Sequence, residues 1–415
     1  MTIPTIHQSL KQYDLIGWSS RVWPPISAMT NRKRYLILLA IVLAVIIVYK
    51  LNNQLIPYST LHIHQNYLLN KIQEKSYIDS VVDDDQDVDL SFHNISHLSV
   101  KEYQFIVLLW TKYFGSDSWS GVDLKTLNCS HSNCLLTDDR SRLSRSDAVF
   151  FHWRDINPRD LPHIHKSGQK WILYNWESPH YSPEYRIRRL ASDIDWTMTY
   201  RRDSDIYVPY GSVDRCRRQW LNEDLFDGKQ RNVAWIVSNC DTPGNREQYV
   251  QELQKYIDVD IYGSCGQYSC PRDDSCLQML EKKYKFYLSF ENSLCKDYIT
   301  EKLFHIVEYD IIPVVYGSAN YMQIMANRSV INVNDFRSPQ ELAEYLKELS
   351  NDKQKYNSYF KWKLSYCPKR TQFTYFCQMC RKLNEYYGKR VDHWKRNKLI
   401  NWWFKEAYCR NPKYT

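Results

Sequence analysis

Short apolar runs bounded by polar turns recur in the region that follows residue 100. Runs of this kind are typical of buried strands in a parallel sheet, because such strands are covered on both faces and read as continuous apolar segments. The pattern predicts a first α/β domain at 101–225. Its expected strands are residues 103–110, 148–153 and 170–176.

The same pattern continues further along the chain, with helix-like segments between the runs. Asp297 and Thr300 suit the start of a helix of about ten residues, because their side-chain oxygens accept hydrogen bonds from the amides of a first turn. A strand, a helix and a second strand make a βαβ unit. We therefore predict a second α/β domain at 226–365 and a cysteine-rich tail at 366–415 that packs on both domains. The expected strands are 233–237, 259–262, 286–290, 311–315 and 330–334, and the other expected helices are 246–256 and 341–349.

An unbroken apolar run occupies residues 36–48 and directly follows a basic cluster. Basic residues before such a run predict a cytoplasmic amino terminus, and the run reaches the span of a thin bilayer when its flanks are included. A cleaved signal peptide is the alternative, but the run begins late and lacks a convincing small-residue cleavage site. We expect a cytoplasmic tail at 1–34, a transmembrane anchor at 35–56 and a polar stem at 57–100.

All 12 cysteines follow this expected anchor. An even number of cysteines on the lumenal side predicts disulfides formed in an oxidising compartment, although their pairing stays open. Cys377 and Cys380 form a CxxC pair, but the alternative of a zinc site needs a second ligand pair that is not evident. Three glycosylation sequons support a lumenal address, at Asn94, Asn128 and Asn327.

The net charge of +8 favours anionic ligands. The basic residues do not form the clustered stripe of a nucleic-acid-binding protein, so we expect no nucleic-acid partner. Aromatic residues make up 15% of the chain. Their faces stack on sugars, but most of them are expected in the core, so composition does not locate a sugar site.

Polar side chains gather where one predicted strand ends and the next helix begins. In βαβ units the ligand lies beyond the carboxyl ends of the strands, where helix amino termini point their partial positive charge. A cation, carboxylates, an amide and an aromatic ring at this place suit a nucleotide with a ribose and two phosphates. These residues are Glu291, Asn292, Tyr298, Glu301 and Lys302.

Two other strand ends carry candidate chemistry. Glu177 follows a predicted strand and precedes a proline turn, where partial burial raises a carboxyl pKa toward the range of a general base. An exposed turn residue is the alternative. Arg246 begins a predicted helix beyond another strand and is placed to clamp a diphosphate with its fork of donors. A surface ion pair is the alternative there.

The segment 195–211 contains Asp203-Ser204-Asp205, the DxD pattern by which many glycosyltransferases hold a metal bound to diphosphate. Arg201 and Arg202 stand beside these carboxylates, and mixed charges usually mean an ion-paired loop. We favour a structural and substrate-shaping role for this segment, together with Asn239, over metal ligation. No residue is assigned as a metal ligand.

Several strings resemble the signature of the alpha-1,3-fucosyltransferase family, whose members transfer fucose from GDP-fucose to N-acetylglucosamine. The strings are FENS, DYITEK and PVVYG within 290–317, YRRDSDI and PYG within 200–211, and ESP at 177–179. The resemblance implies a glycosyltransferase B-type fold, with two Rossmann-like halves facing each other across a cleft. It also implies a single-pass type II protein of the Golgi membrane with a lumenal catalytic part.

Matched residue by residue, the family motifs imply a role for each candidate. Glu177 would be the general base, and Arg246 and Lys302 would neutralise the diphosphate. Asn292, Tyr298 and Glu301 would hold the rest of the GDP-fucose. Inversion of the beta-linked donor would give an alpha-linked fucose. No tightly bound cofactor is expected, and stimulation by manganese or magnesium stays open.

The acceptor substrate is the least defined part of the expected function. Residues 305–310 depart from the glycine-containing stretch of many vertebrate members and look more like invertebrate and plant members, several of which fucosylate the innermost N-acetylglucosamine of N-glycans. We expect core fucosylation of glycoprotein N-glycans, with peripheral Lewis-type or LacdiNAc acceptors as the alternative. A catalytically silent, membrane-anchored glycan-binding protein is a further alternative. The joint presence of Glu177, Arg246, Glu301 and Lys302 argues against it.

Overall fold

The structure is a computed structural model that describes residues 103–412, apart from 120, 218–223, 272–273 and 388–395. The predicted tail, anchor and stem lie outside the described residues, and so does Asn94. Among the described residues, no helix combines the length and the apolar character needed to cross a membrane.

The first sheet is built from six parallel strands, in the spatial order β2-β1-β3-β4-β5-β6. The predicted runs at 103–110, 148–153 and 170–176 contain β1, β3 and β4, so these strands are confirmed. Continuous apolar sequence predicted them well because both faces of the sheet are covered. The strands are β1 (Phe105–Leu109), β2 (Cys134–Thr137), β3 (Ala148–His152), β4 (Lys170–Asn175), β5 (Trp196–Thr199) and β6 (Ile206–Tyr207).

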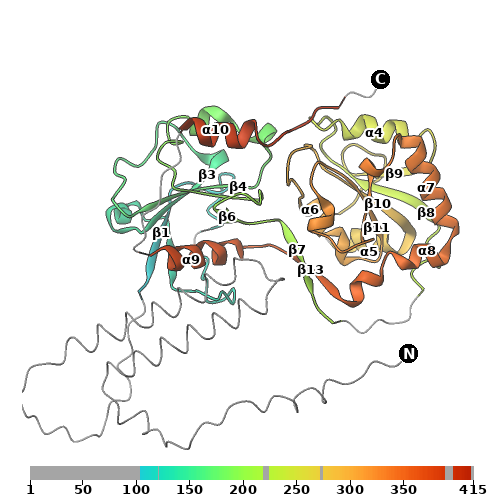
Figure 1. Cartoon of the computed structure of the whole chain (residues 1–415), viewed down its shortest axis with the longest axis horizontal. Helices are drawn as coiled ribbons and strands as arrows, with labels where there is room; N and C mark the ends of the chain where they lie inside the picture. Colours follow the sequence, from blue (N-terminus) through green and yellow to red (C-terminus); the bar gives the residue numbers. More distant parts are fainter. Residues whose placement is uncertain (1–102, 120, 218–223, 272–273, 388–395, 413–415) are drawn as a thin grey trace, which may run out of the picture. The chain divides into compact units, whose positions relative to one another are not determined.

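Two late helices cover opposite faces of this sheet (Figure 1). Val107 and Phe150 point to one face, where they pack against α9 (Tyr375–Tyr386). Leu108 and Phe151 point to the other face, which is covered by α10 (Arg396–Phe404). The first sheet, these helices and the segments between them, residues 103–210 and 375–404, are called the six-stranded lobe below.

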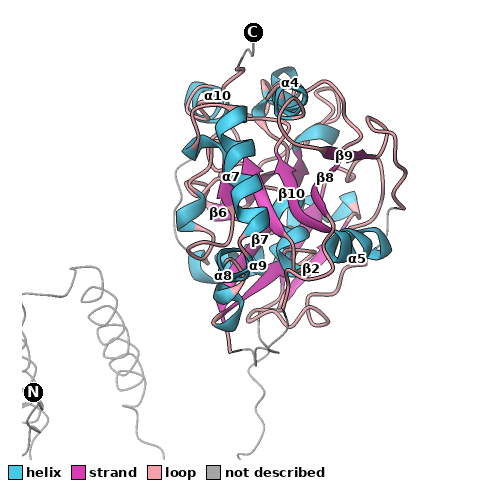
Figure 2. Cartoon of the chain, turned by 90° about the vertical axis from the view of Figure 1, so that its right-hand side faces the viewer, coloured by secondary structure: helices cyan, strands magenta, loops and turns pink. Residues whose placement is uncertain are grey.

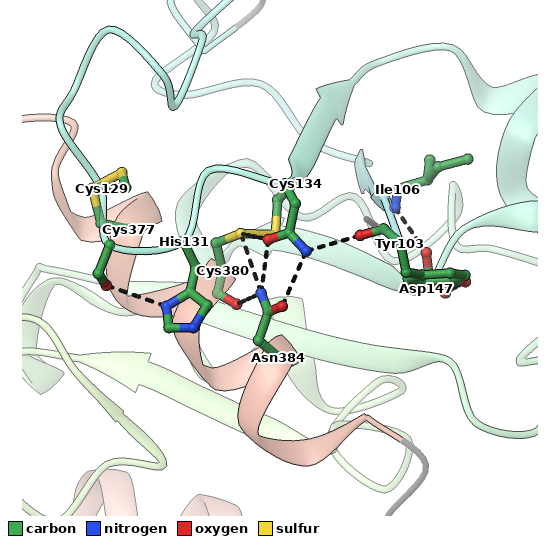
Figure 3. Close-up of a disulfide and its surroundings, with 11 residues drawn as sticks. Tyr103, Ile106, Cys129, His131, Cys134, Asp147, Cys377, Cys380 and Asn384 are labelled. Carbon is green, nitrogen blue, oxygen red and sulfur yellow. Dashed lines mark hydrogen bonds between the residues drawn. A yellow bond between two sulfur atoms is a disulfide. The ribbon is translucent and has the colours of Figure 1, made fainter. Parts of the chain in front are cut away.

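Two disulfides attach α9 to the six-stranded lobe (Figure 3), joining Cys129 to Cys377 and Cys134 to Cys380. The amide of Asn384 donates to the Cys380 carbonyl at 2.8 Å beside them. The CxxC pair is therefore divided between two disulfides and is not a zinc site. All 12 cysteines are paired, which confirms the predicted disulfide network. The other pairs are Cys216–Cys367, Cys240–Cys265, Cys270–Cys276 and Cys295–Cys409.

The second sheet has five parallel strands, in the order β12-β11-β10-β8-β9. Every predicted strand of this region is present, although the one expected at 330–334 contracts to two residues. Residues 224–364, which contain this sheet, are called the five-stranded lobe. The strands are β8 (Arg231–Ile236), β9 (Val259–Tyr262), β10 (Tyr284–Phe290), β11 (Ile312–Tyr316) and β12 (Ile331–Asn332).

Helices cover both faces of the second sheet as well (Figure 2). One face packs against α4 (Arg246–Leu253) and α7 (Pro339–Asn351), and α8 (Lys353–Ser358) continues this layer. The opposite face packs against α5 (Asp274–Lys283) and α6 (Glu301–Phe304). Together the two lobes confirm an α/β fold with two parallel sheets.

The predicted helix of about ten residues after Asp297 is wrong, because α6 spans only four residues. Thr300 caps it by accepting the amide of Lys302. Asp297 adopts a left-handed backbone conformation with φ of 60° and therefore precedes the helix instead of beginning it. A short 3-10 turn at Ile306–Glu308 follows α6 and contains two β-branched residues, which favour continued helix poorly.

β7 (Gly211–Arg215) follows the first sheet in the chain. It pairs with β13 (Tyr366–Arg370) in a two-stranded antiparallel ribbon. A Cβ atom on Gly211 would lie 2.5 Å from the Phe304 ring and 2.6 Å from the Lys369 carbonyl oxygen. The glycine of the PYG string is therefore needed for the close approach of this ribbon to α6.

Each sheet has a point where the direction of strand addition reverses. In the six-stranded sheet this point lies between β1 and β3, and in the five-stranded sheet between β8 and β10. Ligands of parallel α/β sheets bind outside the carboxyl ends of the strands at such points. The candidate site is therefore expected where His152 ends β3 and where Trp110, Asn239 and Glu291 follow β1, β8 and β10.

Candidate functional site

Arg246 lies at the reversal point of the five-stranded sheet. It is the first residue of α4 and is 4% exposed. Its guanidinium donates to the Phe290 carbonyl at 2.7 Å and to the Asn239 carbonyl at 3.2 Å. These carbonyls follow β10 and β8, and Nε pairs with Glu247 at 3.0 Å. The main chain thus fixes a positive charge at the predicted ligand position.

Lys302 stands at the start of α6 between two carboxylates. Its ammonium lies 2.9 Å from the Thr300 hydroxyl, 3.0 Å from Glu301 and 3.5 Å from Glu291. Burial opposes the charged form, but Glu291 and Glu301 outweigh burial and raise the pKa of Lys302, while Arg246 acts in the opposite direction. Lys302 therefore stays protonated close to Arg246.

Glu291 is the buried support of this cluster. It is 1% exposed and accepts the Thr300 amide at 2.7 Å and the Thr300 hydroxyl at 2.9 Å. Burial raises the pKa of its carboxyl, and the Lys302 charge opposes that rise. The sequence placed Glu291 at this strand end but gave it no role, because its full burial is a tertiary property.

Glu301 presents the more exposed carboxylate, with 46% of its side chain accessible. Burial acts against ionisation, but the adjacent Lys302 ammonium dominates and lowers the pKa of Glu301. A charged carboxylate beside a charged ammonium can accept hydrogen bonds from ligand hydroxyl groups while the ammonium binds an anion.

Glu177 comes from the six-stranded lobe, two residues after β4 ends. Its amide donates to the Asn175 side chain at 3.2 Å, so the turn is held by the strand end. Burial raises the pKa of the Glu177 carboxyl, Arg154 and Lys302 lower it, and Glu301 raises it further. Burial is the largest of these effects, so the pKa of the Glu177 carboxyl is shifted toward the range of a general base.

Direct hydrogen bonds join the two lobes beside this carboxyl. The hydroxyl of Ser178 donates to that of Ser293 at 2.7 Å. The amide of Asn239 donates to the Tyr181 hydroxyl at 3.3 Å. The ESP turn therefore lies against the FENS segment, although 115 residues separate the two serines in sequence.

Asn292 and Tyr298 occupy different surroundings. The main-chain carbonyl of Asn292 accepts the Gly244 amide at 3.0 Å, and its side-chain oxygen is buried with no hydrogen-bond partner among the described residues. Tyr298 is 2% exposed and packs edge-to-face on Tyr200, with ring centres 5.0 Å apart. Asn292 keeps an unused acceptor, whereas Tyr298 anchors its segment in the six-stranded lobe. Their donor contacts stay predictions.

Arg201 lies away from the charged cluster. It is fully buried, donates to the Trp402 carbonyl of α10 and lies over the Trp402 ring at 4.3 Å. Two further bonds of 2.9 and 2.7 Å join it to Asp203. Arg202 is exposed, and its guanidinium donates to Gln323 of the five-stranded lobe at 3.2 Å.

The DxD carboxylates do not fit a metal site. Asp203 accepts hydrogen bonds from Arg201 and Lys296, and Asp205 accepts the amide and the hydroxyl of Thr197 at 2.8 and 2.7 Å. Within the described ranges, one trio of metal-ligating residue types gathers at His180, Cys295 and Cys409. Its two cysteines form a disulfide, so this trio offers no thiolate pair for a metal.

The two sequons within the described residues are exposed. Asn128 immediately precedes the disulfide-bonded Cys129, and Asn327 lies in the loop before β12. In the second sequon the Ser329 hydroxyl is buried and donates to the Ala326 carbonyl at 2.6 Å. Glycosylation at all three sequons stays a prediction.

A pocket of about 230 Å³ opens at the carboxyl ends of β1 and β2. Tyr113 forms part of its wall, and burial, followed by the charges of Glu177 and Glu301, raises the pKa of this phenol. Sequence reasoning missed this pocket, although aromatic residues directly after a predicted strand were its visible signal. Its lining includes Trp110, Tyr113, Trp119, Lys112, Arg140, Asp117 and Asp138.

Two parallel α/β lobes with charged residues at their strand ends define a class of proteins that bind ligands at the carboxyl ends of parallel strands. Family models identify the particular family. The model "Fucosyltransferase, N-terminal" matches residues 102–211, and "Glycosyltransferase family 10 (fucosyltransferase) C-term" matches residues 226–402. The chain belongs to glycosyltransferase family 10, the fucosyltransferases, which confirms the family that the motifs resemble.

Two similar proteins come from Drosophila melanogaster. Glycoprotein 3-alpha-L-fucosyltransferase A is 39% identical over 290 residues, covering 68% of this chain and 56% of that protein. Alpha-(1,3)-fucosyltransferase C is 34% identical over 339 residues, covering 73% of this chain and 78% of that protein. The chain thus spans little more than half of the first relative's length.

A solved structure of an alpha1,3-fucosyltransferase with GDP-fucose is also similar. It matches with a TM-score of 0.49 and 16% sequence identity, covering 72% of this chain and 96% of that one.

Proposed function

We propose that this chain is an inverting alpha-1,3-fucosyltransferase that moves fucose from GDP-fucose to N-acetylglucosamine of glycoprotein N-glycans. One observation carries the proposal. The partly buried Glu177 carboxyl, whose pKa burial raises, interacts electrostatically with Glu301 and Lys302 of the other lobe. The Ser178–Ser293 hydrogen bond of 2.7 Å holds the Glu177 turn of the six-stranded lobe against the segment that follows β10, and transfer from a nucleotide sugar needs such a base beside an anion-binding cluster.

The donor fits the charges of the five-stranded lobe. Arg246 and Lys302 stay positively charged at the reversal point of the sheet, where a diphosphate would be bound without a metal ion. The unpartnered side-chain oxygen of Asn292 and the exposed carboxylate of Glu301 are acceptors for donor hydroxyl groups. Donor specificity would then depend on this lobe.

The proposed reaction is a single displacement. The acceptor hydroxyl oxygen attacks the anomeric carbon of fucose, and its proton passes to the Glu177 carboxylate. The bond between the anomeric carbon and the phosphate oxygen breaks, and its electron pair leaves with GDP. Arg246 and Lys302 stabilise the charge that develops on the departing diphosphate. Attack opposite the leaving group converts a beta-linked donor into an alpha-linked product.

The acceptor is assigned to the pocket of the six-stranded lobe. Its aromatic wall suits sugar faces, and it opens at strand ends of the same lobe that supplies Glu177. A glycoprotein acceptor is supported by the name of the first Drosophila relative. We prefer core fucosylation to antennary acceptors because residues 305–310 resemble those of invertebrate and plant members. Ile306 and Val307 of this stretch are buried in the five-stranded lobe, so the preference rests on the resemblance and not on a contact with the acceptor.

The proposed location is the Golgi membrane, with a single type II span and the two lobes in the lumen. Six disulfides support an oxidising compartment. The apolar run at 36–48 is the proposed span.

The decisive experiment incubates the detergent-solubilised full-length chain with labelled GDP-fucose and defined N-glycans, followed by linkage analysis of the product. Glu177→Gln should lower kcat by about 10²- to 10⁴-fold while GDP still binds. Glu184→Gln is the matched control, since Glu184 is a partly exposed glutamate of the same lobe that pairs with Arg188 at 2.9 Å. Full transfer activity in Glu177→Gln would remove Glu177 as the base.

Calorimetry with GDP separates the enzyme from a catalytically silent glycan-binding protein. An enzyme of this family should give saturable heat with GDP, whereas a silent protein that has lost the donor site should give none. A product in which fucose is linked to an outer N-acetylglucosamine would contradict the proposed core specificity but would still support the proposed fucosyl transfer.

A further inference from the structure

The loop between β10 and α6, residues 291–300, is called the donor loop because it carries Asn292, Tyr298 and the support for Lys302. It belongs to the five-stranded lobe by sequence, but Cys295 and Tyr298 pack into the core of the six-stranded lobe. The donor loop is therefore held from the side of the molecule that carries the candidate base.

One ion pair makes this connection at the loop's exposed side. The Lys296 ammonium lies 2.9 Å from the Asp203 carboxylate, and each side chain is 39% exposed. Asp203 also binds the fully buried Arg201, which is fixed to α10. Burial opposes ionisation of Asp203, but Arg201 and Lys296 outweigh it and lower the pKa of Asp203 to about 2. Asp203 thus stays ionised over the pH range in which the protein is expected to work.

A second contact lies one residue further along. The Arg202 amide donates to the Asp297 carboxylate at 3.2 Å, and Asp297 has the left-handed backbone conformation noted above. Arg202 and Asp203 therefore contact two adjacent residues of the donor loop, Asp297 and Lys296. The donor loop is also held by its bridge with Arg410 and by the Cys295–Cys409 disulfide, and the side-chain contacts from the six-stranded lobe add to the support of its bound shape.

We propose that Asp203 is a positioning residue for donor binding, which acts through Lys296 to hold the donor loop in its binding shape. This inference rests on the proposed function and gives the DxD string a role other than metal ligation. Arg201 acts as the buried anchor, Asp203 as the bridge and Lys296 as the contact on the loop. The benefit is preorganisation, because a loop that is already ordered loses less conformational entropy when GDP binds.

The test compares Lys296→Gln with Lys296→Arg in the full-length chain. Lys296→Gln should raise the Kd for GDP and the KM for GDP-fucose about two- to fivefold, the range that a partly exposed ion pair supports. The kcat and the acceptor KM should stay unchanged, and Lys296→Arg should restore donor affinity. Lys369→Gln is the control, because Lys369 forms a 2.9 Å ion pair with Asp214 on the β7–β13 ribbon.

Asp203→Asn completes a double-mutant cycle with Lys296→Gln, and the double variant should bind GDP no more weakly than the weaker single variant. Because Asp203→Asn also removes a partner of buried Arg201 and can lower stability, hydrogen exchange of residues 291–300 is measured without ligand in Lys296→Gln. Faster exchange confined to the donor loop supports the proposal.

Unchanged GDP affinity and unchanged exchange in Lys296→Gln would overturn it. A second result would also overturn the proposal. If a chelator weakens GDP binding in the wild type but not in Asp203→Asn, Asp203 is a metal ligand. A wild type that binds no GDP would instead refute the proposed function, and the exchange measurement would still decide whether Lys296 holds the loop.

Discussion

The hydroxyl oxygens of Ser178 and Ser293 lie 2.7 Å apart, and both side chains are fully buried. Ser178 directly follows Glu177, and Ser293 directly follows Asn292. This hydrogen bond between the lobes thus contributes directly to the separation between the candidate base and the donor loop. The geometry of the proposed transfer therefore depends on a contact that touches neither substrate.

Ser293→Ala should lower both stability and turnover. Loss of a buried neutral hydrogen bond costs about 1 kcal/mol of unfolding free energy, and misplacement of the base should reduce kcat more than GDP affinity. Denaturant unfolding and single-turnover kinetics would measure the two effects. Ser146→Ala is the control, because the buried Ser146 hydroxyl donates to the Arg142 carbonyl at 2.8 Å within its own turn. Equal kcat values in the two variants would contradict this role for Ser293.

The rate should depend on pH through Glu177. A general base must be ionised, so kcat should rise as pH increases through the Glu177 pKa, which burial places above its ordinary value of 4.5. Arg154 lowers this pKa by its charge. Arg154→Gln should therefore move the acid limb of the kcat profile to higher pH, while Arg154→Lys should largely restore it. A profile between about pH 4 and pH 8 at saturating substrates measures the shift.

The matched control for this shift is Arg188→Gln, which removes an exposed arginine that pairs with Glu184 in the same lobe. Its acid limb should coincide with that of the wild type. An unchanged limb in Arg154→Gln would show that the titrating group is not Glu177.

Lys302→Met should weaken donor binding strongly. A charge-assisted hydrogen bond contributes about 1.5–3 kcal/mol, so the Kd for GDP should rise about tenfold or more. Calorimetry would measure this change. Lys285→Met is the control, because Lys285 is a partly buried lysine of the same lobe that donates to the Ser350 carbonyl. Comparable GDP affinity in both variants would exclude Lys302 from the donor site.

The same substitution should change how stability depends on pH. Lys302 lowers the pKa of buried Glu291, so its removal should raise that pKa further. A carboxyl whose pKa is higher in the folded state binds more protons there, and its contribution to stability is lost as pH rises. The unfolding free energy of Lys302→Met should therefore fall with increasing pH more steeply than that of the wild type.

Much of the fold was predictable because its strands are buried on both faces. Mainly apolar runs such as Ala148–His152 and Tyr284–Phe290 are typical of buried strands in a parallel sheet. The positions of Glu177, Arg246 and Lys302 beyond strand ends were predictable because residue type and strand boundaries are local properties, whereas their roles stay predictions. The electrostatic interaction of Glu177 with Lys302 could not be predicted, because the two residues belong to different lobes.

Other features depend on contacts that distant segments make. α9 follows the five-stranded lobe in sequence but is joined to the six-stranded lobe by two disulfides that span more than 240 residues each. Asp203 belongs to a DxD pattern that is typical of metal ligands, but its carboxylate oxygens accept hydrogen bonds from Arg201 and Lys296. Local sequence thus specifies which segments form strands and which side chains are reactive. Burial and long-range pairing, which come from the folded chain as a whole, settle what each charged group does.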